Sequence, residues 1–384
     1  MTMLPSGHRI RLGRIFGIPL EITASWVLLS MLAVWSFWAR YATVFHHRTD
    51  GIAIVMAVVA TVLLTGSILV HELAHGLVGR WRGLRVSAIT LYFFGGATTA
   101  SDPATPVDEL LFTASGPVVN LVLVLVFWGI TGLADHGHAV AIAQVTGEEA
   151  WLNLLLGLFN LVPAAPLDGG HVLESVVWRV TKDRARAVNV AARAGAGVGG
   201  ALIGVGVLEL LFVRGGLFDG LWLGLIGYVL LEGARSAGAR AWVETALRGQ
   251  QARVLLTDHA QPVTKDTSVR WLVYAEFLRH HVDAVPVEDD GRTVGIVLAG
   301  DVMGPGATAD SERTAGDVMH PLGQLPTEPA TADAIEVLRL LADHPVVVLV
   351  DETGRLVGAV SQRQVGLVLD RLRALGASPA PFTR

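Results

Sequence analysis

The sequence predicts a polytopic α-helical membrane protein with about six transmembrane helices, followed by a smaller α/β domain pair. Three observations predict this fold class. Hydrophobic residues make up 52% of the 384 residues and charged residues only 16%, whereas soluble domains carry about 25% charged residues. Apolar stretches long enough to cross a bilayer recur before about residue 235. After residue 250 the chain is more polar and repeats itself.

Six apolar runs are each near the ~20 residues that a helix needs to cross a bilayer. They span residues 20–38, 52–77, 110–133, 141–162, 195–213 and 217–231. Arginine and lysine gather before the first run and after the second, fourth and sixth runs, and few lie on the opposite side. Because positively charged loops stay in the cytoplasm, both termini are predicted to be cytoplasmic, in an integral protein of a bacterial cell membrane. No signal peptide is expected, since residues 5–14 are basic and the first apolar run is too long for one.

A repeat with a constant offset fills the last third of the chain. Thr264 aligns with Thr327, and the string Gly-Arg-x-Val-Gly at residues 291–295 recurs at residues 354–358. Each copy has a helical stretch, at residues 269–280 and 332–343, and then two β-rich runs around a glycine turn. The sequence therefore predicts two domains, residues 1–240 and 250–384. The second domain contains two copies of one α/β module, at about residues 253–306 and 316–371.

The strongest chemical signal is His71-Glu72-Leu73-Ala74-His75 in the second apolar run. On a helix the two histidines share a face, so their imidazoles can grip one metal ion. Glu72 lies beside them and can take a proton from an attacking water molecule. Ionisable groups in a membrane helix each cost about a few kcal/mol and persist mainly where they face a functional cavity. The alternative is a polar cluster that only packs helices together.

A catalytic zinc site needs a third protein ligand and an open position. The chain has no cysteine, so the candidates are histidine, aspartate and glutamate. The segment after the fourth run offers Asp168, because Pro163 and Pro166 stop the helix and Gly169-Gly170 permits a sharp turn back toward the metal. Taken alone, this segment is better explained as an ordinary proline-terminated helix end.

These motifs together resemble the site-2 protease family of intramembrane metalloproteases. The family pairs HExxH on one span with NxxPxxxLDGG on a later one, here residues 71–75 and 160–170. The string Ser-Gly-Pro-x-x-Asn at residues 115–120 is also similar to the family. The resemblance implies one Zn²⁺ ion per chain, with His71, His75 and Asp168 as ligands and Glu72 as the catalytic base.

The resemblance also implies a substrate. This would be a single-span membrane protein, such as an anti-sigma factor, cut within or near its transmembrane segment in the lipid bilayer, with Asn160 and Asn120 assisting substrate or oxyanion binding. The family has a β-like element at the apolar, glycine-rich residues 91–100, and its Gly95-Gly96 edge could bind an unwound substrate as an extra strand. A plain connecting loop is the alternative. The net charge of −5 argues against a nucleic-acid partner.

The C-terminal repeat resembles a tandem cystathionine-β-synthase (CBS) domain pair, which would modulate the protease from the cytoplasmic side. The resemblance implies an adenine nucleotide in the cleft between the repeats, with Asp301 and Ser361 as its contacts. Neither copy is complete, because Leu298 and Gln364 stand at the matching hydroxyl and carboxylate positions. The alternative is a purely structural pair, or one that forms a homodimer.

A transporter or channel gated by the CBS-like pair, with the histidines as an ion site, is the alternative function. Glu72 separates the two hypotheses, because a pure ion site needs no general base beside two imidazoles. A proteolytically inactive membrane scaffold is disfavoured by the intact motifs.

Overall fold

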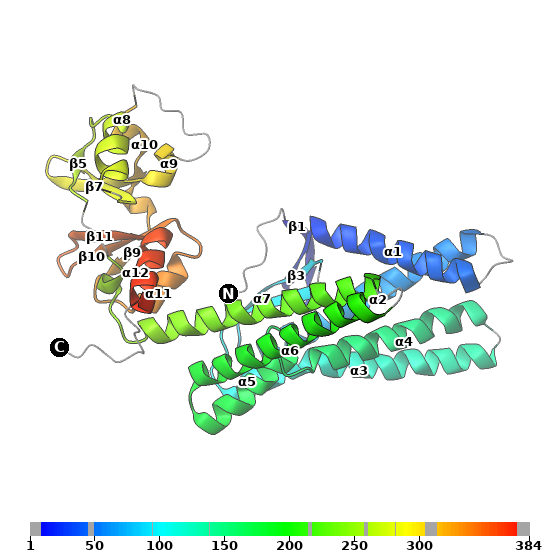
Figure 1. The fold of residues 1–384 in the computed structure, drawn as a ribbon. Coiled ribbons are helices and arrows are strands. Elements are labelled where there is room, and N and C mark those ends of the chain that lie inside the picture. Colours follow the sequence, from blue (N-terminus) through cyan, green and yellow to red (C-terminus); the bar gives the residue numbers. More distant parts are fainter. Residues whose placement is uncertain are drawn as a thin grey trace. The chain divides into compact units, whose positions relative to one another are not determined.

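The computed structural model describes residues 9–44, 50–93, 95–137, 139–213, 217–256, 260–280, 282–303 and 313–374. The chain divides into two compact units, Met1–Ala241 and Trp242–Arg384. The first unit contains the HExxH motif and the second contains the repeat. Figure 1 labels the elements of both.

A four-stranded sheet opens the first unit. Its strands are β1 (Arg9–Ile15), β2 (Ile18–Thr23), β3 (Val86–Tyr92) and β4 (Gly95–Ala100), in the order β1-β2-β3-β4. β2 and β3 pair in parallel, and the other two pairs are antiparallel. β4 is an edge strand, with β3 as its one neighbour in this sheet. Residues 91–92 and 95–100 therefore belong to two paired antiparallel strands rather than to a plain loop.

The first predicted span starts too early. Residues 20–23 belong to β2, and the helix begins at Ala24. The side chains of Ile18, Leu20 and Ile89 pack in one cluster with Trp26 of that helix. These apolar residues form a core between sheet and helix, and an apolar run alone does not distinguish such a core from lipid contact.

Helices make up the rest of the described part of the first unit, and the last of them continues into the second unit. They are α1 (Ala24–Val44), α2 (Asp50–Trp81), α3 (Pro106–His136), α4 (Val140–Asn160), α5 (Asp168–Thr181), α6 (Arg184–Phe212) and α7 (Leu217–Leu247). Among the residues that the structure describes, three stretches are long and apolar enough to cross a membrane: Gly51–Trp81, Pro106–His136 and Arg184–Phe212. Val62, Leu125 and Leu211 point outward from these three helices, as expected of helices that are apolar all round. The other predicted spans overlap α1, α4 and α7, and the total of six remains a prediction.

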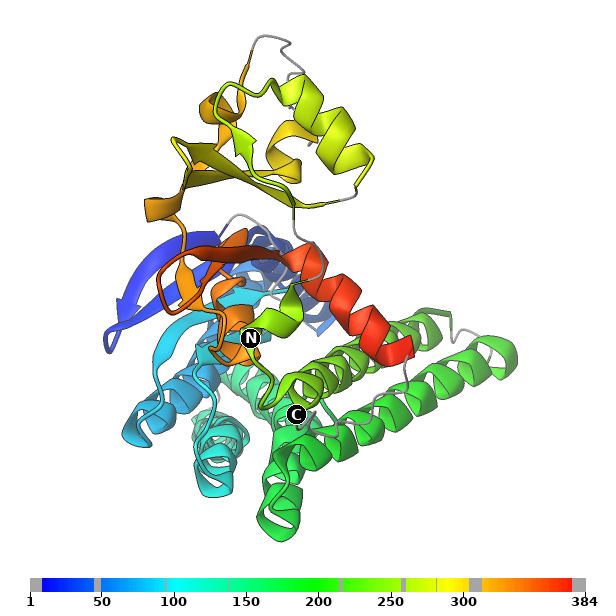
Figure 2. The same cartoon turned by 90° about the vertical axis from the view of Figure 1, so that its left-hand side faces the viewer.

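Helices α2, α3 and α5 meet at the predicted metal ligands, and α4 and α6 pack against them. α3 and α4 lie side by side, and α2 packs against both (Figures 1 and 2). The short helix α5 packs on α3 and α6. This packing brings the HExxH segment of α2, the middle of α3 and the start of α5 to one place.

Two small sheets form the second unit (Figure 2). One contains β5 (Val263–Thr264), β6 (Ala284–Asp289), β7 (Arg292–Leu298) and β8 (His320–Pro321), and the other contains β9 (Thr327–Pro329), β10 (Val346–Val350) and β11 (Leu356–Ser361). Ile296 of the first sheet and Val348 of the second pack in one apolar cluster, so the sheets share a core.

Short helices flank these sheets. They are η1 (Ala252–Leu255), α8 (Val269–Leu272), η2 (Val273–Leu278), α9 (Ala299–Met303), α10 (Ala315–Val318), η3 (Leu322–Gln324), α11 (Ala334–Leu340) and α12 (Gln362–Ala374). The helical stretches predicted at residues 269–280 and 332–343 correspond to α8 with η2 and to α11. The two copies of the repeat therefore have the same helix-then-hairpin order in the structure.

Candidate metal centre

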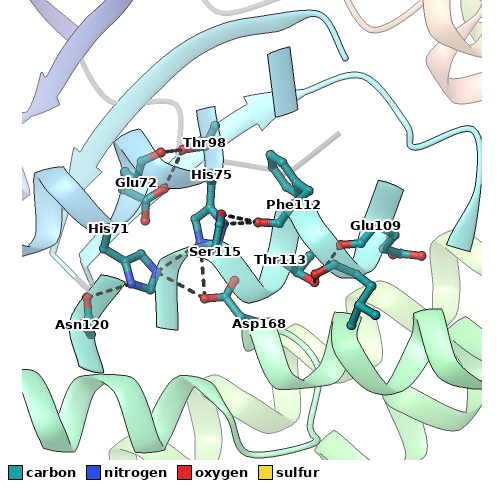
Figure 3. A network of polar contacts seen from close by, with 11 residues as sticks. His71, Glu72, His75, Thr98, Glu109, Phe112, Thr113, Ser115, Asn120 and Asp168 are labelled. Atoms are coloured by element: carbon teal, nitrogen blue, oxygen red, sulfur yellow. Dashed lines mark hydrogen bonds and ion pairs between the residues drawn. The ribbon is translucent and has the colours of Figure 1, made fainter. Parts of the chain in front are cut away.

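Three potential metal ligands converge from two helices (Figure 3). The Nε2 atoms of His71 and His75 on α2 are 3.1 Å apart. Oδ2 of Asp168, the first residue of α5, lies 3.2 Å from Nε2 of His71 and 3.4 Å from Nε2 of His75. One ligand atom from each side chain lies within 4.8 Å of the other two, so the group could hold a metal ion.

The other ring nitrogens of the two histidines are held from α3. Nδ1 of His71 lies 3.1 Å from Oδ1 of Asn120, and Nδ1 of His75 lies 2.7 Å from the main-chain oxygen of Phe112. A main-chain oxygen only accepts, so Nδ1 of His75 carries a proton. Asn120 can hold Nδ1 of His71 in the same way, which leaves Nε2 of each neutral ring for a metal. This donor set of two imidazoles and one carboxylate suits zinc.

Gly116 allows α3 to approach these rings. A Cβ atom at this position would lie 2.4 Å from Nε2 of His75 and 2.6 Å from Nε2 of His71, closer than real Cβ atoms come to other heavy atoms. The string at residues 115–120 therefore supplies both the space for the ligands, through Gly116, and a hydrogen-bond partner, through Asn120.

Asp168 comes back toward the histidines as the prolines predict. α4 ends at Asn160, before Pro163, and α5 starts at Asp168 itself. Burial opposes ionisation of Asp168, but the positive charge and hydrogen bonds of the imidazoles, when protonated, outweigh it and hold the pKa of the carboxyl below its usual range. The carboxylate is therefore ionised at neutral pH, the form that binds metals. Asn160 is half-buried, and its side chain makes no hydrogen bond with the described residues.

Glu72 is buried beside the ligand group and is held by β4 (Figure 3). Oγ1 of Thr98 donates to Oε2 of Glu72 over 2.7 Å and contacts its main-chain oxygen at 2.9 Å. A Cβ atom on Gly96, two residues earlier and on the same face of the strand, would lie 2.3 Å from Cγ of Glu72. The sequence pointed to Gly95 and Gly96 but not to Thr98, although the two-residue period of a strand places Thr98 on the same face as Gly96.

A second polar cluster ties α5 to α3. Nδ1 of His171 lies 3.4 Å from Oε1 of Glu109 and 3.3 Å from Oε2 of Glu174, and Nε of Arg184 lies 3.6 Å from Oε1 of Glu174. Desolvation lowers the pKa of His171, but the hydrogen bonds of the two carboxylates outweigh it and raise the pKa to about 10. Two cations thus face two carboxylates, one helical turn after Asp168.

In the second unit, the two predicted nucleotide contacts have partners within the protein. Oγ of Ser361 donates to Oδ2 of Asp283 over 3.0 Å, and Arg363 donates to Oδ1 of Asp283 over 3.1 Å. Oδ2 of Asp301 lies 2.7 Å from Nε2 of His320. The structure does not bring Asp301 and Ser361 into contact with each other. A hollow of ≈ 420 Å³ in the first copy is lined by other residues, namely Val263, Thr264, Thr267, Ser268 and Trp271.

Comparison with known proteins places this chain in a family. Residues 59–143 and 133–202 match peptidase family M50, and residues 253–304 and 315–365 match the CBS domain. Rip3 of Mycobacterium tuberculosis, a protein named as a zinc metalloprotease, is 35% identical over 300 residues, which cover 75% of this chain and 74% of that protein. The protein sll0528 of Synechocystis, also named as a zinc metalloprotease, is 32% identical over 265 residues, which cover 68% of each chain.

Among solved structures, a site-2 protease from Methanocaldococcus jannaschii is similar to 60% of this chain and 95% of its own, with 22% sequence identity and a TM-score of 0.41. The family assignment rests on the sequence matches, which confirm the resemblance noted from the motifs. The chain therefore belongs to peptidase family M50, the site-2 protease family of zinc metalloproteases, and carries a pair of CBS domains.

Proposed function

We propose that this protein is an intramembrane zinc endopeptidase that hydrolyses a peptide bond within or near the transmembrane segment of another membrane protein. The observation that carries the proposal is the convergence of His71, His75 and Asp168 beside the buried Glu72. This group lies where two helices long and apolar enough to cross a membrane meet a third, short helix. Ionisable groups buried on helices that cross a membrane are a mark of functional sites.

His71, His75 and Asp168 would hold one zinc ion, with the fourth position open. When bound, zinc polarises the scissile carbonyl and lowers the pKa of water. The buried Asn120 and the main-chain oxygen of Phe112 keep the two imidazoles in the orientation that this ligation needs.

Glu72 would act as the general base and then as the general acid. Thr98 holds Oε2, which leaves Oε1 to take a proton from the attacking water and to pass it to the leaving amine. The carboxylate needs this fixed orientation, because a catalytic base works only within hydrogen-bond reach of the proton that it removes.

The substrate would bind in an extended form along β4. β4 has β3 as its one neighbour in this sheet, Gly96 lies against Glu72, and strand addition to such an edge exposes the peptide bond. A helical substrate hides its carbonyls in hydrogen bonds and must unwind first. Asn160 and Asn120 would assist at this site, and the β4 hairpin supports this part of the proposal.

We expect the substrate to be a single-span membrane protein, such as an anti-sigma factor, in a bacterial cell membrane. The distribution of arginine and lysine supports cytoplasmic termini. The CBS pair would then modulate cleavage, through an adenine nucleotide or by forming a homodimer. The occurrence of both domain types in one chain supports regulation, since a ligand of the pair can bias access only by binding one form more tightly.

The test uses purified full-length protein in detergent with a labelled single-span substrate. Glu72→Gln should keep its zinc and lose cleavage, because it removes the base and leaves the three ligands. His71→Ala should lose both zinc and cleavage. Cleavage at the wild-type rate by zinc-loaded Glu72→Gln would overturn the proposed mechanism.

A further inference from the structure

Glu149 of α4 is a buried carboxyl group without a hydrogen-bond partner. Its side chain is 0% exposed, and neither Oε1 nor Oε2 has a partner among the described residues. An isolated ionised carboxylate is strongly disfavoured in an apolar interior, so such a group keeps its proton unless something else in the site compensates it. Even the neutral acid needs hydrogen bonds when buried.

Polar side chains continue from Glu149 toward the metal ligands. One turn along α4, the Nδ2 atom of Asn153 donates to Oγ of Ser67 over 3.1 Å and to the main-chain oxygen of Glu149 over 2.9 Å. Ser67 lies one turn before His71 on α2. The next turn of α4 carries Gly157, where a Cβ atom would lie 3.3 Å from Cβ of Asn120, the partner of His71.

This column contains further buried atoms that have no partner among the described residues. They are Oδ1 of Asn153, Nδ2 of Asn120 and the hydroxyl of Tyr41. The Asn153 amide is oriented by its donation to a main-chain oxygen. The Asn120 amide is oriented by the proposed ligation of a metal through Nε2 of His71, which puts the proton on Nδ1 facing Asn120. The free groups are thus an acceptor on Asn153, a donor on Asn120, and both kinds on a protonated Glu149.

We propose that Glu149, Asn153, Ser67 and Asn120 line an internal binding site for a file of ordered water molecules that ends beside His71. Water matches this mixture because it donates and accepts, whereas a cation binds only acceptors and would leave Nδ2 of Asn120 unpaired. Gly157 lies eight residues after Glu149 on α4, about 12 Å along the helix axis, so one water alone could not join Glu149 to Asn120. Tyr41, which belongs to the same apolar cluster as Val145 one turn before Glu149, closes the far end.

The proposed water site does not depend on which bond the protein cuts. Its test therefore measures the protonation and hydrogen bonding of Glu149 instead of cleavage. Infrared spectra of the full-length protein in lipid nanodiscs are recorded in H2O and after transfer to D2O. The expected result is a carboxylic-acid C=O band at a hydrogen-bonded frequency that shifts in D2O and is absent from Glu149→Gln. Glu209→Gln is the matched control, because Glu209 also has an unpaired buried oxygen but lies on α6.

Asn153→Leu tests the water contact without altering the acid itself. It should move the Glu149 band toward the frequency of an unbonded acid, while circular dichroism and zinc content stay as in the wild type. If no acid band disappears in Glu149→Gln, the carboxylate is ionised and the site holds a cation, which overturns the proposal. A band at the unbonded frequency that does not respond to D2O shows a dry site and overturns it equally.

Discussion

Thr98 donates a hydrogen bond of 2.7 Å to Oε2 of Glu72. Thr98 lies on the edge strand β4 and Glu72 on α2, so the bond links two elements that are distant in the sequence. This bond couples the strand proposed to bind the substrate to the group proposed as the base. A strand that shifts would therefore move the carboxylate as well.

Thr98→Val should slow cleavage and leave zinc content unchanged. A hydrogen bond to a charged group is worth about 1.5–3 kcal/mol, which corresponds to a loss of roughly 10- to 100-fold in kcat. The measurement is kcat and KM on a single-span substrate, with zinc measured in the same sample. The loss should fall mainly on kcat, because the bond positions the base and does not contact the substrate.

Two variants control this prediction. Thr98→Ser keeps the hydroxyl and should recover most of the rate. Thr99→Val changes the neighbouring residue, which points to the opposite face of β4, and should leave the rate near that of the wild type. Equal losses in Thr98→Val and Thr99→Val would show that the strand, and not this hydrogen bond, was damaged.

Gly116→Ala should abolish zinc binding. The added methyl group would lie 2.4 Å and 2.6 Å from the two Nε2 atoms, so α3 or both imidazoles must move. Gly129→Ala on the same helix is the control, because a Cβ atom there meets nothing within 4 Å. The control should keep its zinc and gain about 1 kcal/mol in helix propensity. Full zinc occupancy in Gly116→Ala would show that the ligands do not depend on this close approach.

Asp168→Ala should purify with much less zinc than the wild type, whereas Glu174→Gln, on the same helix, should keep it. Asp168 supplies one of the three converging ligand atoms, and Glu174 contacts His171 and Arg184 instead. Metal analysis of both purified proteins is sufficient. Wild-type zinc content in Asp168→Ala would remove this residue from the ligand set.

The candidate metal centre could be predicted in part from local patterns, and the full ligand set was implied by the family resemblance. His71 and His75 are one helical turn apart, and Asp168 follows a pair of prolines that must end a helix. Gly96 and Asn120 were found by resemblance, and their contacts with Glu72 and His71 are consistent with that choice.

The partners of these residues could not be predicted, because they depend on which helices meet. Most of α3 and all of α4 lie between Glu109 and His171 in the sequence. The two residues become neighbours only because α5 packs on α3. Glu149 and Asn153, spaced four residues apart in an apolar run, offered a usable signal for a polar face. Their relation to Ser67 required the packing of α4 on α2.

The last prediction concerns how pH affects the attachment of α5 to α3. The pKa of His171 is raised from 6.5 to about 10, so the folded protein holds this proton more tightly than the unfolded chain does. The stabilisation is complete below about pH 6.5 and is lost as the pH rises through about 10. Replacing His171 by Gln should therefore lower the Tm most at pH 6, and the difference from the wild type should shrink as the pH approaches 10. His136→Gln is the control, since within the described part of the chain Nδ1 of His136 contacts the main-chain oxygen of Gly132 and no carboxylate. A Tm difference for His171→Gln that is the same at pH 6 and pH 10 would show that the charge of His171 does not hold the two helices together.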